Sequence, residues 1–256
     1  MARAPARRGG GGSLVFWLVA LGGAAAIFVF FFFSSAMSRP GPSAEDRAFV
    51  VERGDSGAAI AANLEEQGLI NDDFLFRVAN RLYGGGNALQ AGEYQIPARA
   101  SVREIVEMMT SGDALLHAIT FPEGITIAAV MRIIEESDVL TGDMPEAPPE
   151  GSILPDTYHV QRGMSRAALL QLMRDAHDEA VAEIWANRAP NLPITTVEDF
   201  VTLASIVERE TGIAAERPMV AGVFINRLRV PMRLETDPTI IYGVCLRFPQ
   251  RCRDGR

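Results

Sequence analysis

The polarity pattern of the chain begins with a long apolar run. Residues 14–37 contain no charged side chain and are rich in Phe, Ala, Val and Leu. Crossing the hydrocarbon core of a bilayer takes about 20 apolar residues, so this run predicts a transmembrane helix. Three arginines lie in residues 1–13, and the positive-inside rule keeps that basic tail in the cytoplasm and exports the rest of the chain. A cleaved signal peptide is the competing interpretation, because residues 35–38 include small side chains that a signal peptidase accepts, but the run is long for such a segment.

After the apolar run, the pattern predicts a small subdomain over residues 48–114. Residues 38–47 are polar and contain two prolines, which is typical of a linker. The predicted elements are a strand over 48–52, a helix from Ser56 to about 67, a helix after the Asn71–Asp73 cap, a strand over 92–96, and a helix that opens on a Ser101–Glu104 capping box. Strand, helix, helix, strand is the order of a LysM-like module. Glycan binding by this module and a plain spacer role both stay open.

The polarity pattern of residues 115–243 predicts a second domain that contains both strands and helices. The predicted elements are a strand over 118–121, helices over 125–136, 164–186 and 197–211, and a further apolar helix that carries Asn226. With the subdomain before it, this domain predicts an α+β fold class behind one transmembrane helix.

Composition narrows the function classes. The net charge of the 256-residue chain is −8, without long acidic runs, which argues against nucleic acid as a partner. The three histidines are scattered and form no cluster with metal-ligand spacing, so we expect neither a metal nor a cofactor. Cys245 and Cys252 could pair in an oxidising compartment, although we interpret their Arg-rich surroundings as a poorly ordered end.

Two glutamates at the end of the 197–211 helix are candidates for acid catalysis. A carboxyl group at the edge of an apolar surface is poorly solvated, which keeps its proton available near neutral pH. Glu208 and Glu210 fall near the two borders of the apolar face, about 160° apart on an ideal helix, so they do not share one pocket wall. The helical wheel does not choose between them, and a solvated carboxylate at a helix end is the ordinary alternative for either.

A series of short motifs surrounds these glutamates. The chain contains FPEG at 121–124, EGSILPDTY at 150–158, LASIVERET at 203–211, VFINRL at 223–228, MRLETDPT at 232–239 and YG at 242–243. In this order and spacing, from about residue 48 to 243, the motifs resemble those of the endolytic murein transglycosylases, also called YceG-like proteins.

The resemblance implies a set of site residues. It points to Glu210 first, and Glu208 second, as the catalytic glutamate. Five further positions match motif residues that could contact substrate: Asp156, Tyr158, Asn226, Thr236 and Asp237. For Asn226 a structural bridge is an equal alternative, and for Asp237, which precedes Pro238, the favoured alternative is a helix N-cap. Glu235 stands where the family usually has Gln, which puts any inherited role at that position in doubt.

The resemblance also implies a reaction. One glutamate protonates the oxygen between N-acetylmuramic acid and N-acetylglucosamine, and the same carboxylate then accepts the proton of the muramoyl 6-hydroxyl as it attacks C1. The product is a 1,6-anhydro end on a glycan strand of nascent peptidoglycan. The implied location is the bacterial inner membrane, with the catalytic domain in the periplasm, and the implied partners are glycan strands and peptidoglycan synthases.

Residues 244–256 depart from the family pattern. The family continues with a Tyr-Asn-Thr-Tyr stretch and a Gly-Leu-Pro-Pro-Gly turn, and this sequence has neither after Gly243. We therefore expect an incomplete catalytic domain and weak activity. The alternative function is that of a non-catalytic, membrane-anchored peptidoglycan-binding protein.

The apolar run generates a topology prediction. We expect a reporter enzyme that works only in the periplasm to be active when it is fused after Arg256, because the basic tail holds the N-terminus inside. Activity of a cytoplasmic reporter alone at that position would contradict the topology.

Overall fold

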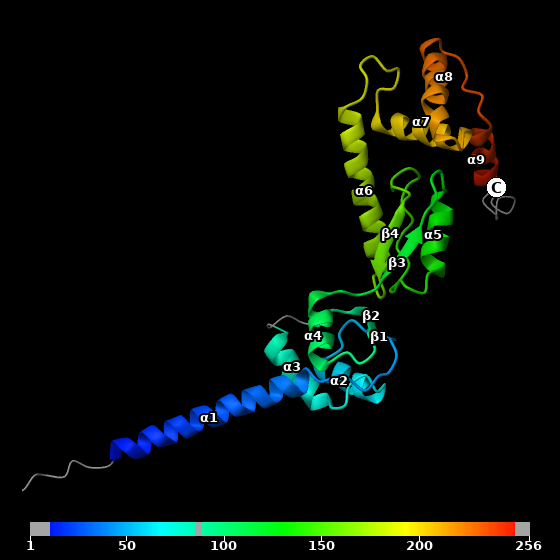
Figure 1. The fold of residues 1–256 in the computed structure, drawn as a ribbon. Coiled ribbons are helices and arrows are strands. Elements are labelled where there is room, and N and C mark those ends of the chain that lie inside the picture. Colours follow the sequence, from blue (N-terminus) through cyan, green and yellow to red (C-terminus); the bar gives the residue numbers. More distant parts are fainter. Residues whose placement is uncertain (1–10, 85–88, 249–256) are drawn as a thin grey trace, which may run out of the picture. The chain divides into compact units, whose positions relative to one another are not determined.

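The computed structural model describes residues 11–84 and 89–248, and it divides into two compact units, residues 1–115 and 116–256 (Figure 1). The chain is an α+β protein with an apolar N-terminal helix, which confirms the predicted fold class at that level. Each unit is described by itself below.

Unit 1 contains the apolar helix and a small strand–helix–helix–strand arrangement. Its elements are α1 (Gly11–Met37), β1 (Arg47–Val51), α2 (Gly57–Glu66), α3 (Asp73–Tyr83), β2 (Gly92–Ile96) and α4 (Val102–Ser111). The predicted N-caps are confirmed: the Ser56 side chain accepts from the Ala59 N–H, Asp72 caps α3, and Ser101 with Glu104 forms the capping box of α4. Gly112 ends α4 with a φ of +75°, a conformation that favours glycine.

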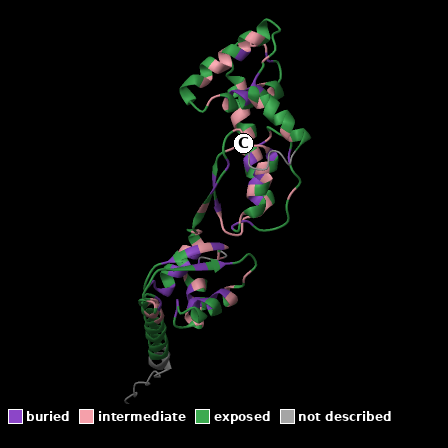
Figure 2. Ribbon diagram, turned by 90° about the vertical axis from the view of Figure 1, so that its right-hand side faces the viewer, coloured by how far each residue is buried: buried purple, intermediate pink, exposed green. Residues whose placement is uncertain are grey.

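The core of unit 1 lies between a two-stranded sheet and the helices. β1 and β2 pair antiparallel, with Phe49 opposite Tyr94. Buried and exposed residues alternate along the strands, and Figure 2 colours each ribbon segment by its burial. Phe49 and Tyr94 pack in one buried cluster with helix residues such as Leu64, Phe76 and Ile105. Hydrophobic burial of this kind holds unit 1 together.

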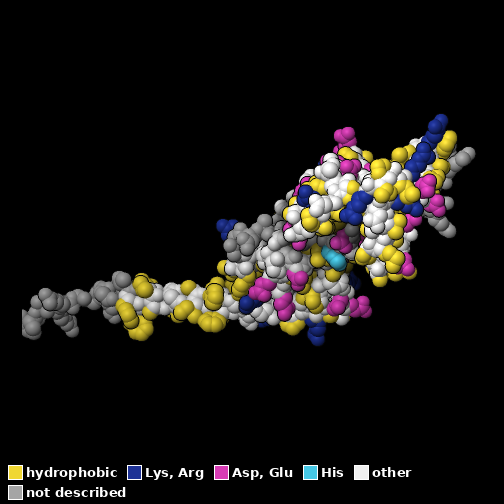
Figure 3. All heavy atoms as spheres, turned by 90° about the horizontal axis from the view of Figure 1, so that it is seen from above, with side chains coloured by type: hydrophobic (Ala, Val, Ile, Leu, Met, Phe, Trp, Pro, Cys, Tyr) yellow, Lys and Arg dark blue, Asp and Glu magenta, His cyan; other side chains and the backbone are white. Residues whose placement is uncertain are grey.

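Helix α1 is the one helix in the described residues that is long and apolar enough to cross a membrane, over Phe16–Met37 with a mean hydropathy of 2.4. Its apolar side chains project without cover along most of its length (Figure 3). A signal sequence meets the same criteria of length and composition. Length and composition are therefore compatible with either an anchor or a signal sequence.

Unit 2 contains a second two-stranded sheet and most of the helices. Its elements are β3 (Leu116–Thr120), α5 (Ile127–Glu136), β4 (Thr157–Gln161), α6 (Arg166–Ala186), α7 (Val197–Glu210), the 3₁₀ turn η1 (Ala214–Glu216), α8 (Arg217–Arg229) and α9 (Asp237–Arg247). One cluster of buried residues packs between β3, β4, α5 and α6, and a smaller one packs between α7 and α8.

Strand β4 corrects one expectation. The sequence analysis predicts no strand around Tyr158, but residues 157–161 pair antiparallel with β3, with Ile119 opposite Tyr158. Tyr158 and Val160 are buried while their neighbours His159 and Thr157 are exposed, which is the alternation of a strand. The Pro155–Asp156 turn signal immediately before the segment concealed this short alternating pattern.

Unit 1 offers a matched pair of phenylalanines on α3 for a test of its core. Phe76 is 0 % exposed, whereas Phe74 is 54 % exposed on the same helix. We expect Phe76→Ala to lower the free energy of unfolding by about 3–5 kcal/mol, because it leaves a cavity. Phe74→Ala should change it by less than about 0.5 kcal/mol. Denaturant unfolding of both variants measures the difference, and equal effects would contradict this core.

Candidate active site

Helix α7 is the element on which the candidate site is built. Thr196 caps its first turn by accepting from the Asp199 N–H at 3.1 Å. Its apolar face buries Leu203, Ile206 and Val207 in the cluster that contains Phe224 of α8. The helix ends at Glu210, so both candidate glutamates lie in its last turn.

Two glycine loops lie directly against α7. Gly124 of the FPEG loop has a φ of +68°, and a Cβ there would overlap the side chain of Arg209. Gly151 of the second loop has a φ of +73°, and a Cβ there would lie 3.1 Å from Val201. Glycine is favoured at both positions because the backbone is left-handed and the helix approaches closely. Arg209 is exposed, and its side chain covers the Gly124 loop.

Glu150, just before Gly151, connects a third element to this region. Its carboxylate accepts from the Ile127 N–H at 3.1 and 3.2 Å, at the positive N-terminal end of α5. Burial raises the pKa of Tyr242 in α9, and the negative charge of Glu150 raises it further. The motif loops and the start of α9 thus converge around α7. The sequence analysis did not single out Glu150, although its place in the EGSILPDTY motif could have indicated it.

The two glutamates of α7 contact different elements. Arg217, the first residue of α8, donates from Nη2 to Oε1 of Glu208 at 2.6 Å. The Glu208 side chain is 25 % exposed and the Arg217 side chain 38 % exposed, so this ion pair is partly shielded from water. The sequence analysis missed Arg217, because nothing in the chain marks a partner nine residues after Glu208.

Glu210 has a neutral partner instead. Thr236, immediately before α9, donates from its hydroxyl to Oε2 of Glu210 at 3.3 Å. Thr236 is 2 % exposed, whereas Glu210 is exposed. The structure therefore brings together two residues that the sequence analysis had predicted separately, and it leaves the Glu210 carboxyl group open to solvent.

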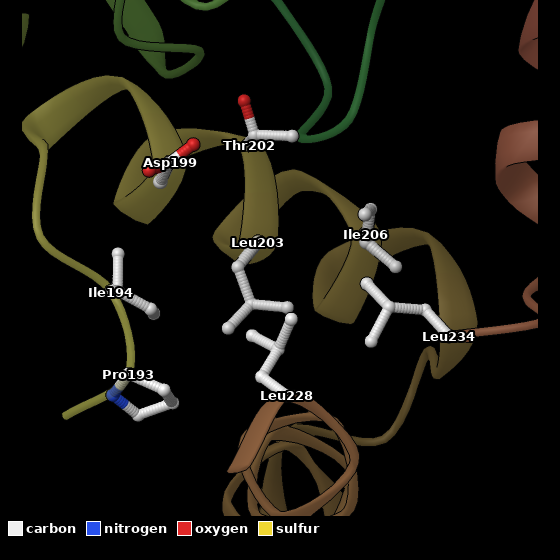
Figure 4. Close-up of a pocket in the computed structure, with 8 residues that line it drawn as sticks. All are labelled: Pro193, Ile194, Asp199, Thr202, Leu203, Ile206, Leu228 and Leu234. Carbon is white, nitrogen blue, oxygen red and sulfur yellow. The ribbon is translucent and has the colours of Figure 1, made fainter. Parts of the chain in front are cut away.

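An apolar pocket lies beside α7 (Figure 4). The side chains of Leu203 on α7 and Leu228 on α8 point toward one another within it. Ile206 also lines the pocket, and Glu210 follows Ile206 by four residues, which places it one turn further along the same side of the helix. Glu210 thus lies one turn beyond the apolar pocket, at its edge rather than among its lining residues, and it is exposed.

The loop before α9 is held by a residue that the sequence analysis passed over. Arg227 of the VFINRL motif donates from its guanidinium to the carbonyl oxygen of Leu234. Glu235 follows with a φ of +48°, a left-handed conformation that is uncommon outside glycine. This contact orders the segment that delivers Thr236 to Glu210.

Three predicted substrate contacts, Asn226, Asp156 and Asp237, are exposed. Asn226 accepts from Arg229 at 3.3 Å on its own helix, and the Asp156 carboxylate accepts from the neighbouring Thr157 N–H at 2.7 Å. Asp237 was favoured as an N-cap, but α9 begins at Asp237 itself and Thr236 occupies the cap position without a side-chain cap bond. The pair Asp-Pro places the proline at the second helical residue here, which shifts the cap by one position. Substrate contact by these three residues stays a prediction.

Tyr158 lies inside the core of unit 2. It is 8 % exposed, its hydroxyl donates to the Leu154 carbonyl at 2.7 Å, and its ring meets Phe121 edge to face at 6.0 Å. Burial raises the pKa of Tyr158, and the charge of Asp156 adds to the shift. Its visible contacts hold the β3–β4 sheet, and its contact with substrate also stays a prediction.

Two chemical points complete the site. In the part of the chain that the structure describes, no three His, Cys, Asp or Glu side chains are placed to hold a metal ion. Pairing of Cys245 with Cys252, which the sequence analysis left as an alternative, falls outside the described residues because Cys252 comes after residue 248.

Comparison with known proteins identifies relatives of this chain. The model of the YceG-like family matches residues 49–253. The endolytic murein transglycosylase of Streptococcus pneumoniae serotype 2 (strain D39 / NCTC 7466) is 23 % identical over 239 residues, covering 75 % of this chain and 42 % of that protein. The endolytic murein transglycosylase of Bacillus subtilis (strain 168) is 25 % identical over 225 residues, covering 75 % of this chain and 62 % of that protein.

A solved structure is also similar. The crystal structure of a YceG-like protein from Listeria monocytogenes has 25 % sequence identity and a TM-score of 0.38, and the match covers 78 % of this chain and 76 % of that one. A TM-score this low supports no structural argument. The family match confirms the resemblance found in the motifs.

The Glu208–Arg217 ion pair generates a stability prediction. A double-mutant cycle with Glu208→Gln and Arg217→Ala should give a coupling free energy of about 1–2 kcal/mol, because the pair is charge-assisted and partly buried. The exposed Arg103–Glu107 pair on α4, at 2.7 Å, is the matched control and should give about 0.3–0.5 kcal/mol. Denaturant unfolding measures both, and coupling no larger than the control would mean that the pair does not fasten α7 to α8.

Proposed function

Because the chain belongs to the YceG-like family, we propose that it is a membrane-anchored endolytic transglycosylase of peptidoglycan. The relatives named above carry that activity in their names. The observation that carries the proposal for this chain is the position of Glu210, at the end of the apolar helix α7 and beside the buried hydroxyl of Thr236. The proposed substrate bond joins N-acetylmuramic acid to N-acetylglucosamine.

The partners of the two glutamates favour Glu210 as the acid. A guanidinium can only donate hydrogen bonds, so Arg217 needs an acceptor and occupies one of the carboxylate oxygens of Glu208. A hydroxyl can both donate and accept, so Thr236 can partner Glu210 whether its carboxyl group is ionised or protonated. A group that first gives and then takes a proton needs a partner of the second kind.

The proposed reaction needs one carboxyl group. Glu210 gives its proton to the glycosidic oxygen, the bond from that oxygen to C1 of the muramoyl residue breaks, and an oxocarbenium-like state forms. The ionised Glu210 then accepts the proton of the muramoyl 6-hydroxyl while that oxygen bonds to C1. An ordinary glycosidase uses a second carboxyl group to attack C1 or to activate water. Here the nucleophile is already part of the substrate, which gives it a proximity advantage.

The other parts of the chain have proposed roles that support this activity. We propose that α1 is an uncleaved anchor in the inner membrane, that unit 1 beyond α1 is a LysM-like module, and that residues 116 onward form the exported catalytic domain. Asp156, Tyr158, Asn226, Thr236 and Asp237 remain candidates for substrate contact, and synthases remain proposed partners.

The chain spans about half the length of the curated relatives it matches, 42 % and 62 %. The substrates and partners of those whole proteins are therefore part of the proposal for this chain.

The test of Glu210 compares two isosteric changes two residues apart. Glu210→Gln should abolish the formation of 1,6-anhydro ends, because an amide keeps the shape of the side chain but cannot deliver a proton; loss of a general acid costs about 10²–10⁴ in rate. Glu208→Gln is the matched control and should cost much less. Mass spectrometry of digested glycan strands measures the products, for the chain as given and for the chain joined to the family's C-terminal region.

Three outcomes would count against the proposal at different levels. If Glu208→Gln is inactive and Glu210→Gln is active, the assignment within the pair is wrong. If neither change matters, the single-acid mechanism is wrong for this chain. If both forms of the wild-type chain bind glycan strands without cutting them, the protein is a peptidoglycan-binding protein instead.

A further inference from the structure

The last turns of α1 belong to the core of unit 1. Met37 is 0 % exposed in the same buried cluster as Phe49 and Phe76, and Phe33 packs against that cluster. Ser34 on α1 also contacts Tyr83 on α3, with the two hydroxyl oxygens 3.3 Å apart. From Phe16 to Phe32, by contrast, the side chains of α1 are exposed.

The chain after α1 is fastened to unit 1 as well. Residues 38–47, expected to be a linker, run beside the segment that follows β2. The Gly41 N–H donates to the Arg99 carbonyl at 3.0 Å, and the Arg99 N–H donates to the Ser43 carbonyl at 2.8 Å. Asp46 accepts from the Ala98 N–H at 2.8 Å. A segment held at both ends in this way does not let unit 1 swing freely about α1.

The length of the apolar run fixes where this contact lies relative to a bilayer. A membrane-spanning helix takes about 20 residues, and counting from Leu14, the start of the uncharged run, places the far boundary near Phe33 and Ser34. That is the point at which the side chains of α1 pass from exposed to covered by unit 1. Residues of unit 1 that touch Ser34 therefore lie at the level of the lipid headgroups.

The end of α3 has the side chains that suit this level. Tyr83 is partly buried, with the guanidinium of Arg103 4.9 Å from its ring centre. Leu82 beside it is 54 % exposed, and Arg81 is exposed. Tyrosine is enriched at membrane interfaces, and arginine can lay its apolar stem along lipid while its charge reaches the phosphates.

We propose that unit 1 is seated on the outer surface of the bilayer, with the end of α3, residues Arg81–Tyr83, in the headgroup layer. The proposal rests on the anchor assignment within the proposed function but not on the transglycosylase chemistry. It also requires that α1 is retained, because cleavage within residues 35–38 would remove Ser34 and its contact with Tyr83 and would cut the chain beside Met37. The membrane partner is a phospholipid surface, which would contact the basic side chain of Arg81, the apolar side chain of Leu82 and the aromatic ring of Tyr83.

The test uses the full chain in vesicles of phosphatidylethanolamine and phosphatidylglycerol. The vesicles contain a phospholipid with a photoreactive diazirine near its glycerol end, and mass spectrometry maps the cross-linked residues. We expect cross-links in the outer turns of α1 and at Leu82 or Tyr83. We expect none at Val50, which is 43 % exposed but lies on β1 between the inward-facing Phe49 and Val51, and so faces away from the helices.

Two matched variants sharpen the test. Leu82→Glu should lower the cross-linking yield at residues 82–83 several-fold while leaving that of α1 unchanged, and Val50→Glu should alter neither. Both positions are exposed, so neither change should unfold unit 1. Cross-links confined to α1 would contradict the proposal that residues 81–83 lie in the headgroup layer. A cross-linking yield at residues 82–83 that Leu82→Glu does not change would contradict it too.

The same preparation separates this inference from the proposed function. An intact mass that corresponds to a chain cleaved after residue 35 would show that α1 is removed. That result would contradict the proposed position of unit 1 on the bilayer. Formation of 1,6-anhydro ends is measured in a separate assay. If no such ends form, the transglycosylase assignment is wrong, but the cross-links still test whether residues Arg81–Tyr83 lie in the headgroup layer.

Discussion

The burial of one face of α7 against α8 is the constraint on which the candidate site depends. Leu203, Ile206 and Val207 are each 8 % exposed and fix the rotation of the helix. Once that rotation is fixed, Glu208 and Glu210 point toward different neighbours, because two steps of about 100° place them about 160° apart around the helix. One carboxylate is fastened to a guanidinium and the other meets a hydroxyl. The two glutamates therefore have different hydrogen-bond partners because of how α7 packs.

The contacts around α7 also explain why separate motifs are needed. Gly124 and Gly151 let two loops approach the helix, and Arg227 holds the loop that carries Thr236. Gly124 meets the helix at Arg209, next to Glu210, whereas Gly151 meets it at Val201, more than two turns earlier. A side chain at either glycine would strain a left-handed backbone and would press against a side chain of α7, Arg209 or Val201.

Local features of the structure were predictable from the sequence, and contacts across the chain were not. The caps at Ser56, Asp72 and Ser101 depend on neighbours within three residues, and all three are confirmed. The strand around Tyr158 was missed because its pairing with Ile119 joins residues far apart in the sequence. Arg217 as the partner of Glu208 was missed for the same reason. The resemblance to the family favoured Glu210 over Glu208 as the catalytic glutamate, whereas the helical wheel alone did not choose between them.

The central claim is that the nucleophile comes from the substrate and not from water. The most direct measurement is digestion of purified glycan strands in water enriched in heavy oxygen, followed by mass spectrometry of the new ends. The account predicts 1,6-anhydro ends without heavy oxygen, because the muramoyl 6-hydroxyl closes on C1 within the same sugar. Reducing ends that carry heavy oxygen at C1 would show hydrolysis and contradict the account.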